Sequence, residues 1–170
     1  MRIKLKKLRE DAIVPVRGSQ YAAGLDLYAC MNHKGACTIQ PHQTMKVGTG
    51  IALEIPDGYF GAIFARSGMA TNKGLRPSNC VGVVDSDYRG EIIVALHNDT
   101  DTKQTFANGE RVAQIVFLPY LAVEFTEVDE LNNTMRAGGG FGSTGEMYIK
   151  GETGTEFIGQ IPGQMSLFER

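Results

Sequence analysis

Short apolar or alternating runs, separated by glycine, proline, asparagine or aspartate, recur along most of the chain. Runs of this length and period predict β-strands, and segments with helical period are scarce. The predicted strands cover residues 3–8, 25–30, 38–40, 44–47, 50–55, 59–65, 91–96, 112–118 and 122–128. Pro41-His42 and Pro56-Asp57-Gly58 predict turns between strands. The pattern therefore predicts an all-β domain of about a dozen short strands, closed or sandwiched.

Two segments depart from simple strands. Residues 67–72 are the best candidate for a short helix, with Ser67 as its N-cap. Residues 79–93 place two apolar arms around the polar tip at residues 85–90, which predicts a β-hairpin. The unpaired backbone groups of such a tip can bind the edge of a planar ligand.

The sequence changes character after about residue 132. Residues 136–145 read Arg-Ala-Gly-Gly-Gly-Phe-Gly-Ser-Thr-Gly, and backbone this rich in glycine predicts a flexible arm. The rest is polar and glycine-punctuated until apolar residues return near the C-terminus. We therefore divide the chain into a β domain (1–133), a glycine-rich arm (134–145) and an extension (146–170).

Composition narrows the class of protein. The 170 residues are 42% hydrophobic and 21% charged with a net charge of −2, as expected for one soluble globular domain. That charge predicts no direct binding to nucleic acid or to a membrane surface. No run is long enough to cross a bilayer. The odd count of 3 cysteines favours a reducing compartment, so we expect a cytoplasmic protein.

Candidate chemistry is spread along the chain. Residues 65–68, Ala-Arg-Ser-Gly, lie at a strand-to-helix junction that can hold a phosphate. The glycine run after Arg136 can wrap phosphates, although Glu146 stands where a Walker A loop needs lysine. A zinc site is also conceivable, from Cys30, His33, Cys37 and His42. These four residues span a predicted strand, turn and strand, so buried or free thiols are the preferred interpretation.

Five segments together resemble the ordered motifs of the trimeric deoxyuridine triphosphatase family. They are residues 23–28, 65–68, 82–91, 109–114 and 136–145. They occur in the family's order and at similar intervals, and the resemblance covers nearly everything from residue 3 to residue 145. It implies a jelly-roll-like β-barrel, a homotrimer whose three sites are shared between chains, and hydrolysis of dUTP to dUMP and pyrophosphate. That activity limits uracil incorporation into DNA and supplies dUMP for thymidylate synthesis.

The resemblance also implies roles for individual residues. Asp85 is the expected catalytic base. The expected substrate-binding residues are Arg66, Ser67, Gly68, Asn79, Val83, Val84, Tyr88, Ile93, Gln114, Arg136, Phe141 and Gly142. Mg²⁺ is the expected cofactor, held by substrate phosphates and water with no direct protein ligand. For Asp26, a structural bond to the neighbouring chain is at least as plausible as a role in the water network of the site.

The extension has no counterpart in most family members. Residues 164–168 resemble the peptide by which bacterial replication proteins bind the sliding clamp, with Gln164, Leu167 and Phe168 as the contact residues. Two alternatives stay open. One is a dCTP deaminase, or a bifunctional deaminase–diphosphatase, which uses a glutamate near the same hairpin. The other is a family member with an added protein-binding regulatory role.

Overall fold

The computed structural model describes residues 1–32, 35–140, 149–151 and 154–156 of the chain. These fall into two units, Met1–Val123 and Glu124–Arg170, which we describe separately. Across the described ranges, no helix has the length and apolar character needed to span a membrane. The first unit ends at Val123, and the functional boundary at residue 133 stays a prediction.

The first unit is built from short strands and one seven-residue helix. Its elements are β1 (Lys4–Lys7), β2 (Val16–Arg17), β3 (Leu25–Tyr28), β4 (Ala36–Ile39), β5 (Thr44–Gly48), β6 (Ile51–Glu54), β7 (Tyr59–Phe64), α1 (Ser67–Lys73), β8 (Leu75–Pro77), β9 (Gly82–Val84), β10 (Ile93–Asn98), β11 (Gln104–Ala107) and β12 (Arg111–Pro119).

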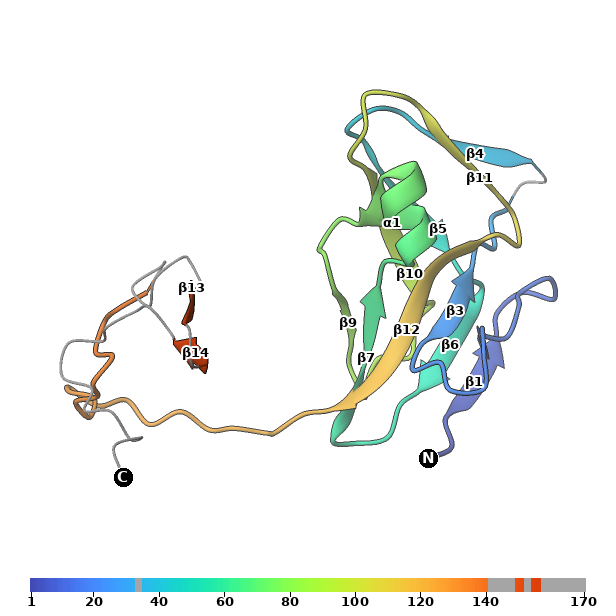
Figure 1. Cartoon of the computed structure of the whole chain (residues 1–170). Helices are drawn as coiled ribbons and strands as arrows, with labels where there is room; N and C mark the ends of the chain where they lie inside the picture. Colours follow the sequence, from blue (N-terminus) through green and yellow to red (C-terminus); the bar gives the residue numbers. More distant parts are fainter. Residues whose placement is uncertain (33–34, 141–148, 152–153, 157–170) are drawn as a thin grey trace. The chain divides into compact units, whose positions relative to one another are not determined.

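The strands pair antiparallel in several sheets (Figure 1). The largest has the order β2-β3-β12-β7-β9, and a second has the order β5-β10-β8. Two further pairs, β1-β6 and β11-β4, complete the unit. Alternate residues point inward from these strands and form one core, in which Leu27, Val47, Ile51, Leu96, Phe106 and Ile115 are almost completely buried. The all-β fold class predicted from the sequence is confirmed.

The segment predicted as a strand over residues 122–128 is extended without regular pairing among the described residues. Its apolar side chains are open to solvent: Val123, in the first unit, is 65% exposed. In the second unit, Phe125 is 96% exposed. An alternating sequence forms a stable strand only when it pairs with a partner strand, and residues 122–128 have no such pairing among the described residues. The prediction was wrong for the single chain.

The predicted hairpin over residues 79–93 is also wrong. Among the described strands, β9 pairs with β7, whereas β10 pairs with β5 and β8. Both apolar arms exist, but each finds its partner in a different sheet. The polar segment between Val84 and Ile93 therefore crosses from one sheet to the other.

The short helix forms as predicted, but its cap differs. The N-cap of α1 is Arg66, with φ −80° and ψ 140° and no side-chain capping bond within the described residues. Ser67 is already helical, and its carbonyl oxygen accepts a bond from Thr71 Oγ1 at 2.7 Å. Gly74 ends the helix with φ 59°, a left-handed conformation that suits glycine.

The second unit contains a small antiparallel pair that the sequence did not predict. Its strands are β13 (Ile149–Gly151) and β14 (Gly154–Glu156). Upstream, the Nε of Arg136 donates to the carbonyl oxygen of Gly139 at 2.9 Å, which closes a turn at the start of the glycine run.

Candidate active site

A cavity of about 230 Å³ lies where the crossing segment leaves β9 and enters β10. Six predicted site residues line it: Asn79, Val83, Val84, Asp85, Tyr88 and Ile93. The sequence reasoning missed four other lining residues, Ile63, Gly82, Glu91 and Ile92. Ile63 comes from β7 and reaches the cavity because it pairs with Gly82 of β9. No local sequence motif predicts this strand register.

Tyr88 is held firmly against the crossing segment. Its hydroxyl donates to the carbonyl oxygen of Glu91 at 3.0 Å, and its N–H donates to that of Asp85 at 3.3 Å. A Cβ on Gly90 would lie 2.4 Å from the tyrosine oxygen, so the ring packs on bare backbone. This close approach explains the glycine two residues after the tyrosine.

Glu91 anchors the same segment to the turn between β5 and β6. Its Oε1 accepts a bond from the N–H of Gly50 at 2.7 Å. Beside it, Thr49 Oγ1 donates to the carbonyl oxygen of Ile92 at 2.7 Å. The carboxylate of Glu91 is therefore engaged in structure, although the residue borders the cavity.

Asp85 is exposed and borders two cavities. The second, about 580 Å³, lies beside the first and is lined by Phe60, Val83, Asp85, Ser86, Asp87 and Tyr120. Within the described part of the chain, the carboxylate of Asp85 makes no ion pair or hydrogen bond. A solvent-facing carboxylate without a protein partner keeps its oxygens available to accept hydrogen bonds from water or a ligand.

Arg66 is oriented by Asp26. The Nε of Arg66 donates to Oδ1 of Asp26 at 2.7 Å, and Nη1 of Arg111 lies 3.2 Å from Oδ2. Asp26 is only 7% exposed, so two guanidinium groups neutralise a buried carboxylate. Each carboxylate oxygen of Asp26 therefore accepts a bond from one arginine.

Gln114 lies in the same region. Its Nε2 donates to the carbonyl oxygen of Ala65 at 2.9 Å, directly before Arg66. A Cβ on Gly24 would come within 2.5 Å of Gln114 Oε1, so the first and fourth family-like segments touch here. The two segments thus support the residues that precede α1.

The far end of α1 is fastened by Lys73. Its Nζ bonds to the carboxylate of Glu110 and, at 3.1 Å, to the carbonyl oxygen of Thr105. Burial alone would raise the pKa of Glu110, but the bonds from Lys73 and from the N–H of Ala107 outweigh it and lower that pKa. Ser67 and Gly68, at the start of this helix, are exposed. Among the described residues that line the 230 Å³ cavity, neither they nor Arg66 appear.

Other predicted residues lie elsewhere. Arg136 belongs to the second unit. Phe141, Gly142, Gln164, Leu167 and Phe168 lie outside the described residues.

The four residues weighed as zinc ligands have separate surroundings. Cys30 is buried, with Sγ 3.4 Å from Asp11 Oδ1, and burial followed by that bond raises the pKa of its thiol. Burial likewise raises the pKa of Cys37. His42 Nε2 lies 2.9 Å from Asp101 Oδ1, and His33 lies outside the described residues. Over the described ranges, no three His, Cys, Asp or Glu side chains converge.

Comparison with known proteins identifies the family. The family model for dUTPase matches residues 10–145. The chain is 48% identical over 145 residues to the deoxyuridine 5'-triphosphate nucleotidohydrolase of Hydrogenobaculum sp., covering 85% of this chain and 99% of that one. It is 45% identical to the enzyme of the same name from Desulfitobacterium hafniense, covering 85% and 97%.

Solved structures agree with the fold. The dUTPase of Staphylococcus bacteriophage 80alpha with dUPNHPP superposes with a TM-score of 0.77 at 25% identity, covering 85% of this chain and 99% of that chain. The dUTPase from phage phi11 of S. aureus gives a TM-score of 0.70 at 21% identity, covering 79% and 100%. The match of the family model and the identity to these relatives, over most of both chains, show that the chain belongs to the dUTPase family.

Proposed function

We propose that the chain hydrolyses dUTP to dUMP and pyrophosphate, as the names of its relatives imply. The observation that carries the proposal is the 230 Å³ cavity, whose lining brings an asparagine, a tyrosine and an aspartate together with isoleucine and valine side chains of β7, β9 and β10. A planar base with one polar edge suits such a lining.

In this proposal the base enters between β9 and β10. Asn79 and the backbone near Val83, Val84 and Ile93 bind the polar edge of uracil, and tight packing there excludes a 5-methyl group. Tyr88, fixed by Glu91 and packed on Gly90, lies under the deoxyribose and leaves no space for a 2′-hydroxyl. A rigid aromatic wall discriminates by shape because moving it would break its hydrogen bond.

Asp85 acts on water in the proposed reaction. Its exposed carboxylate accepts a proton from a water molecule whose oxygen forms a bond to the α-phosphorus. The bond from that phosphorus to the oxygen bridging the α- and β-phosphates breaks, and pyrophosphate leaves. Ser67 stabilises the charge that develops on the leaving oxygen. General-base assistance of this kind is worth ~10²–10⁴-fold in rate.

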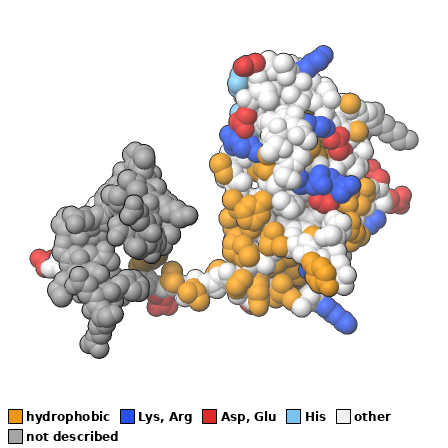
Figure 2. All heavy atoms as spheres, in the orientation of Figure 1, with side chains coloured by type: hydrophobic (Ala, Val, Ile, Leu, Met, Phe, Trp, Pro, Cys, Tyr) orange, Lys and Arg blue, Asp and Glu red, His pale blue; other side chains and the backbone are white. Residues whose placement is uncertain are grey.

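We infer a homotrimer whose sites are shared between chains. The support is that Arg66, Ser67 and Gly68 do not line the base cavity in the described part of their own chain. Gln114 supports the same residues through the carbonyl oxygen of Ala65. A second chain would bring its own phosphate-binding residues 66–68 to the base cavity of the first. Apolar side chains also gather over β7 and β9 (Figure 2), and Val83 of β9 is 62% exposed. Arg136, Phe141 and Gly142 are proposed to complete the phosphate and base contacts from the arm.

Mg²⁺ is the proposed cofactor. No three carboxylate, imidazole or thiol groups converge in the described residues, and both oxygens of Asp26 already bind arginines. We therefore propose that the triphosphate and water carry the cation. The cation partly neutralises the charge of the triphosphate. The structure of one mutant of the phage phi11 dUTPase reveals how a structural Mg(II) ion is coordinated.

Pyrophosphate release by the purified protein with Mg²⁺ tests the proposal. We expect fast release from dUTP and little from dTTP, dCTP or UTP. The Asp85→Asn variant should bind dUTP with an unchanged Kd and lose ~10²–10⁴-fold in kcat. Full activity of that variant would refute the role of Asp85 while leaving the activity itself intact.

A dCTP deaminase is the competing activity, and ammonia release from dCTP would reveal it. Glu91 is the glutamate of the crossing segment, and its carboxylate is bonded to the backbone of Gly50. That engagement favours the triphosphatase.

A second proposal concerns the extension. We propose that Gln164, Leu167 and Phe168 bind a bacterial sliding clamp, on the support of the sequence pattern. Purified clamp should retain the intact protein and release the Leu167→Ala/Phe168→Ala variant. Equal retention of both, or of neither, would overturn the proposal.

We also propose a cytoplasmic location, from the cysteine usage.

A further inference from the structure

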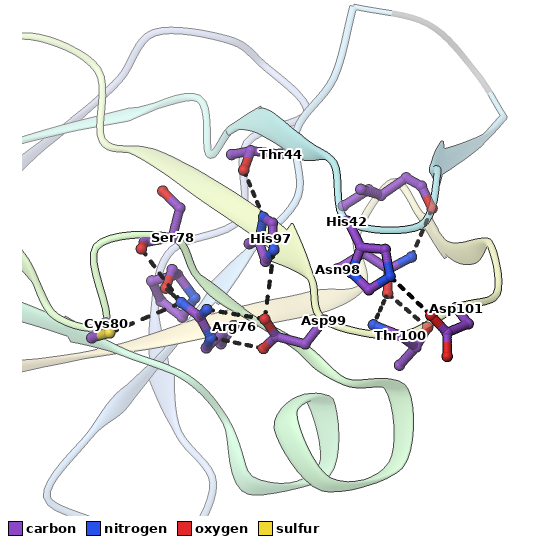
Figure 3. A network of polar contacts seen from close by, with 12 residues as sticks. His42, Thr44, Arg76, Ser78, Cys80, His97, Asn98, Asp99, Thr100 and Asp101 are labelled. Carbon is purple, nitrogen blue, oxygen red and sulfur yellow. Dashed lines mark hydrogen bonds and ion pairs between the residues drawn. The ribbon is translucent and has the colours of Figure 1, made fainter.

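Arg76 lies between an acidic anchor and the turn that carries Asn79 (Figure 3). Its Nε donates to Asp99 Oδ2 at 2.7 Å and its Nη2 to Oδ1 at 2.9 Å, a two-point grip on one carboxylate. Its Nη1 points the other way, toward the carbonyl oxygens of Pro77 at 3.2 Å and Ser78 at 3.4 Å. The guanidinium therefore joins Asp99 to the backbone of the turn.

The turn is tightly wound. The N–H of Cys80 donates to the carbonyl oxygen of Pro77 at 3.0 Å, and the N–H of Val81 donates to that of Asn79 at 2.7 Å. Cys80 has φ 63°, a left-handed conformation that residues other than glycine adopt only when the surroundings hold it. Arg76 Nη1 also lies 3.9 Å from Cys80 Sγ, so one side chain contacts the turn at both ends.

Asn79 depends on this turn for its placement. It lines the base cavity, and its Nδ2 lies 3.6 Å from the position a Cβ would take on Gly82. Within the part of the chain that the structure describes, no hydrogen bond fixes its side-chain amide. The position of the amide is therefore set by the backbone of residues 77–80.

The anchor, Asp99, directly follows the last residue of β10 in the β5-β10-β8 sheet. Arg76 pairs with His97 across β8 and β10, and His97 pairs with Thr44 across β10 and β5. His97 Nδ1 lies 2.9 Å from Thr44 Oγ1, and its Nε2 lies 3.5 Å from Asp99 Oδ1. The N–H of Asp99 donates to the carbonyl oxygen of Gly74 at 2.9 Å. Asp99 is thus fixed by side-chain and backbone contacts.

We propose that Arg76 is a positioning residue for base recognition: braced by Asp99, it fixes the Pro77–Cys80 turn and so aims the Asn79 amide into the cavity. The inference rests on the proposed role of Asn79 in binding the base. It assigns a function to a residue outside the cavity lining, on a strand that the sequence did not predict.

Steady-state kinetics on dUTP and dCTP test the inference. Arg76→Met keeps most of the side-chain volume and removes the fork. We expect KM for dUTP to rise about 10-fold with kcat within about 2-fold, since the reacting groups are untouched. The preference for dUTP over dCTP should narrow by a similar factor, because the amide reads the edge where these bases differ. In Arg76→Lys, KM for dUTP should lie between the values for the natural protein and for Arg76→Met.

A double-mutant cycle with Asn79→Ala separates the possible outcomes. If Arg76 acts through Asn79, Arg76→Met should add nothing to KM in the Asn79→Ala background. Additive effects would overturn the positioning role and leave the role of Asn79 standing. A normal KM and base preference in Asn79→Ala would overturn the role of Asn79, and this inference with it.

Two controls guard against a general loss of stability. Lys4→Met removes another exposed ion pair, with Glu54, and should leave KM and base preference unchanged. Asp99→Asn keeps Arg76 but weakens its anchor, and should raise KM in the same direction as Arg76→Met. If Arg76→Met and Asp99→Asn lower only the melting temperature, Arg76 is merely structural and the inference fails.

Discussion

Arg66, a half-buried arginine, pairs with the nearly buried Asp26, and its Nε lies 2.7 Å from Asp26 Oδ1. Asp26→Asn should weaken this charge-assisted bond, which is worth about 1.5–3 kcal/mol. The guanidinium would then sample several orientations, and kcat/KM for dUTP should fall ~10–100-fold. Steady-state pyrophosphate release measures the loss.

Asp101→Asn is the matched control for this prediction. Asp101 also pairs with a basic side chain, His42, but its own side chain is 96% exposed. Its replacement should leave kcat/KM within about 2-fold, because exposed ion pairs contribute little. Equal losses in the two variants would show that Arg66 does not need Asp26.

Gly50 should tolerate no side chain. Its φ is 68°, and a Cβ would lie 2.7 Å from Cys30 Sγ and 2.8 Å from the Cβ of Ala12. Strain and overpacking together predict that Gly50→Ala lowers the free energy of unfolding by about 2–5 kcal/mol. Gly58 has a similar φ of 80° with nothing within 4 Å of a Cβ, so Gly58→Ala should cost only about 1–2 kcal/mol. Urea unfolding of both variants checks the difference, and equal costs would contradict the packing argument.

The Lys73–Glu110 pair should stabilise the protein at neutral pH and lose that effect in acid. The pKa of Glu110 is lowered below its ordinary value of 4.5, so the contribution is present above that value and disappears as pH falls through the folded-state pKa. Both side chains are about one-third exposed, so the effect should be at most ~1 kcal/mol.

Unfolding curves of the natural protein and Lys73→Met from pH 7 to pH 3 measure this dependence. The two stabilities should converge in acid. Lys103→Met removes an exposed lysine that has no ion pair in the described chain. Its free energy of unfolding should equal that of the natural protein at every pH. If the difference in free energy of unfolding between the natural protein and Lys73→Met stays constant with pH, Lys73 acts by packing alone.

The three thiols should differ in reactivity. Cys30 and Cys37 are 5% and 3% exposed, and burial raises the pKa of both, so they should stay protonated and shielded. Cys80 is exposed. A thiol reagent at pH 8 should label one cysteine quickly and the other two only on unfolding. Cys80→Ser should abolish the fast phase, and a surviving fast phase would contradict the burial.

Period and turn chemistry were sufficient to predict most of the long strands. β5 alternates over four residues, and β6, β7 and β12 each contain an apolar run of at least three. Gly58 takes the left-handed turn conformation that Pro56-Asp57-Gly58 predicts. Strands such as β2, with two residues, and β8, with three, carry too few positions to show a period. Their existence depends on neighbours that are distant in sequence.

The candidate site shows the same division. The residues of the 79–93 segment were predicted from their resemblance to a family, and the structure brings them to one cavity. The bond between Asp26 and Arg66 joins residues 40 positions apart, and that between Arg76 and Asp99 joins residues 23 apart. Opposite charges at such separations are common in any sequence, and only the pairing of β8 with β10 brings the second pair together.

The segment that crosses from β9 to β10 makes the cavity a joint property of two sheets. A nucleotide held there contacts residues from both, so its binding energy is lost if either sheet opens. By mass action, bound nucleotide therefore stabilises both sheets together, and this stabilisation is lost when the nucleotide dissociates. Amide protons of β7 and β10 should therefore exchange more slowly, by one common factor, as the cavity fills.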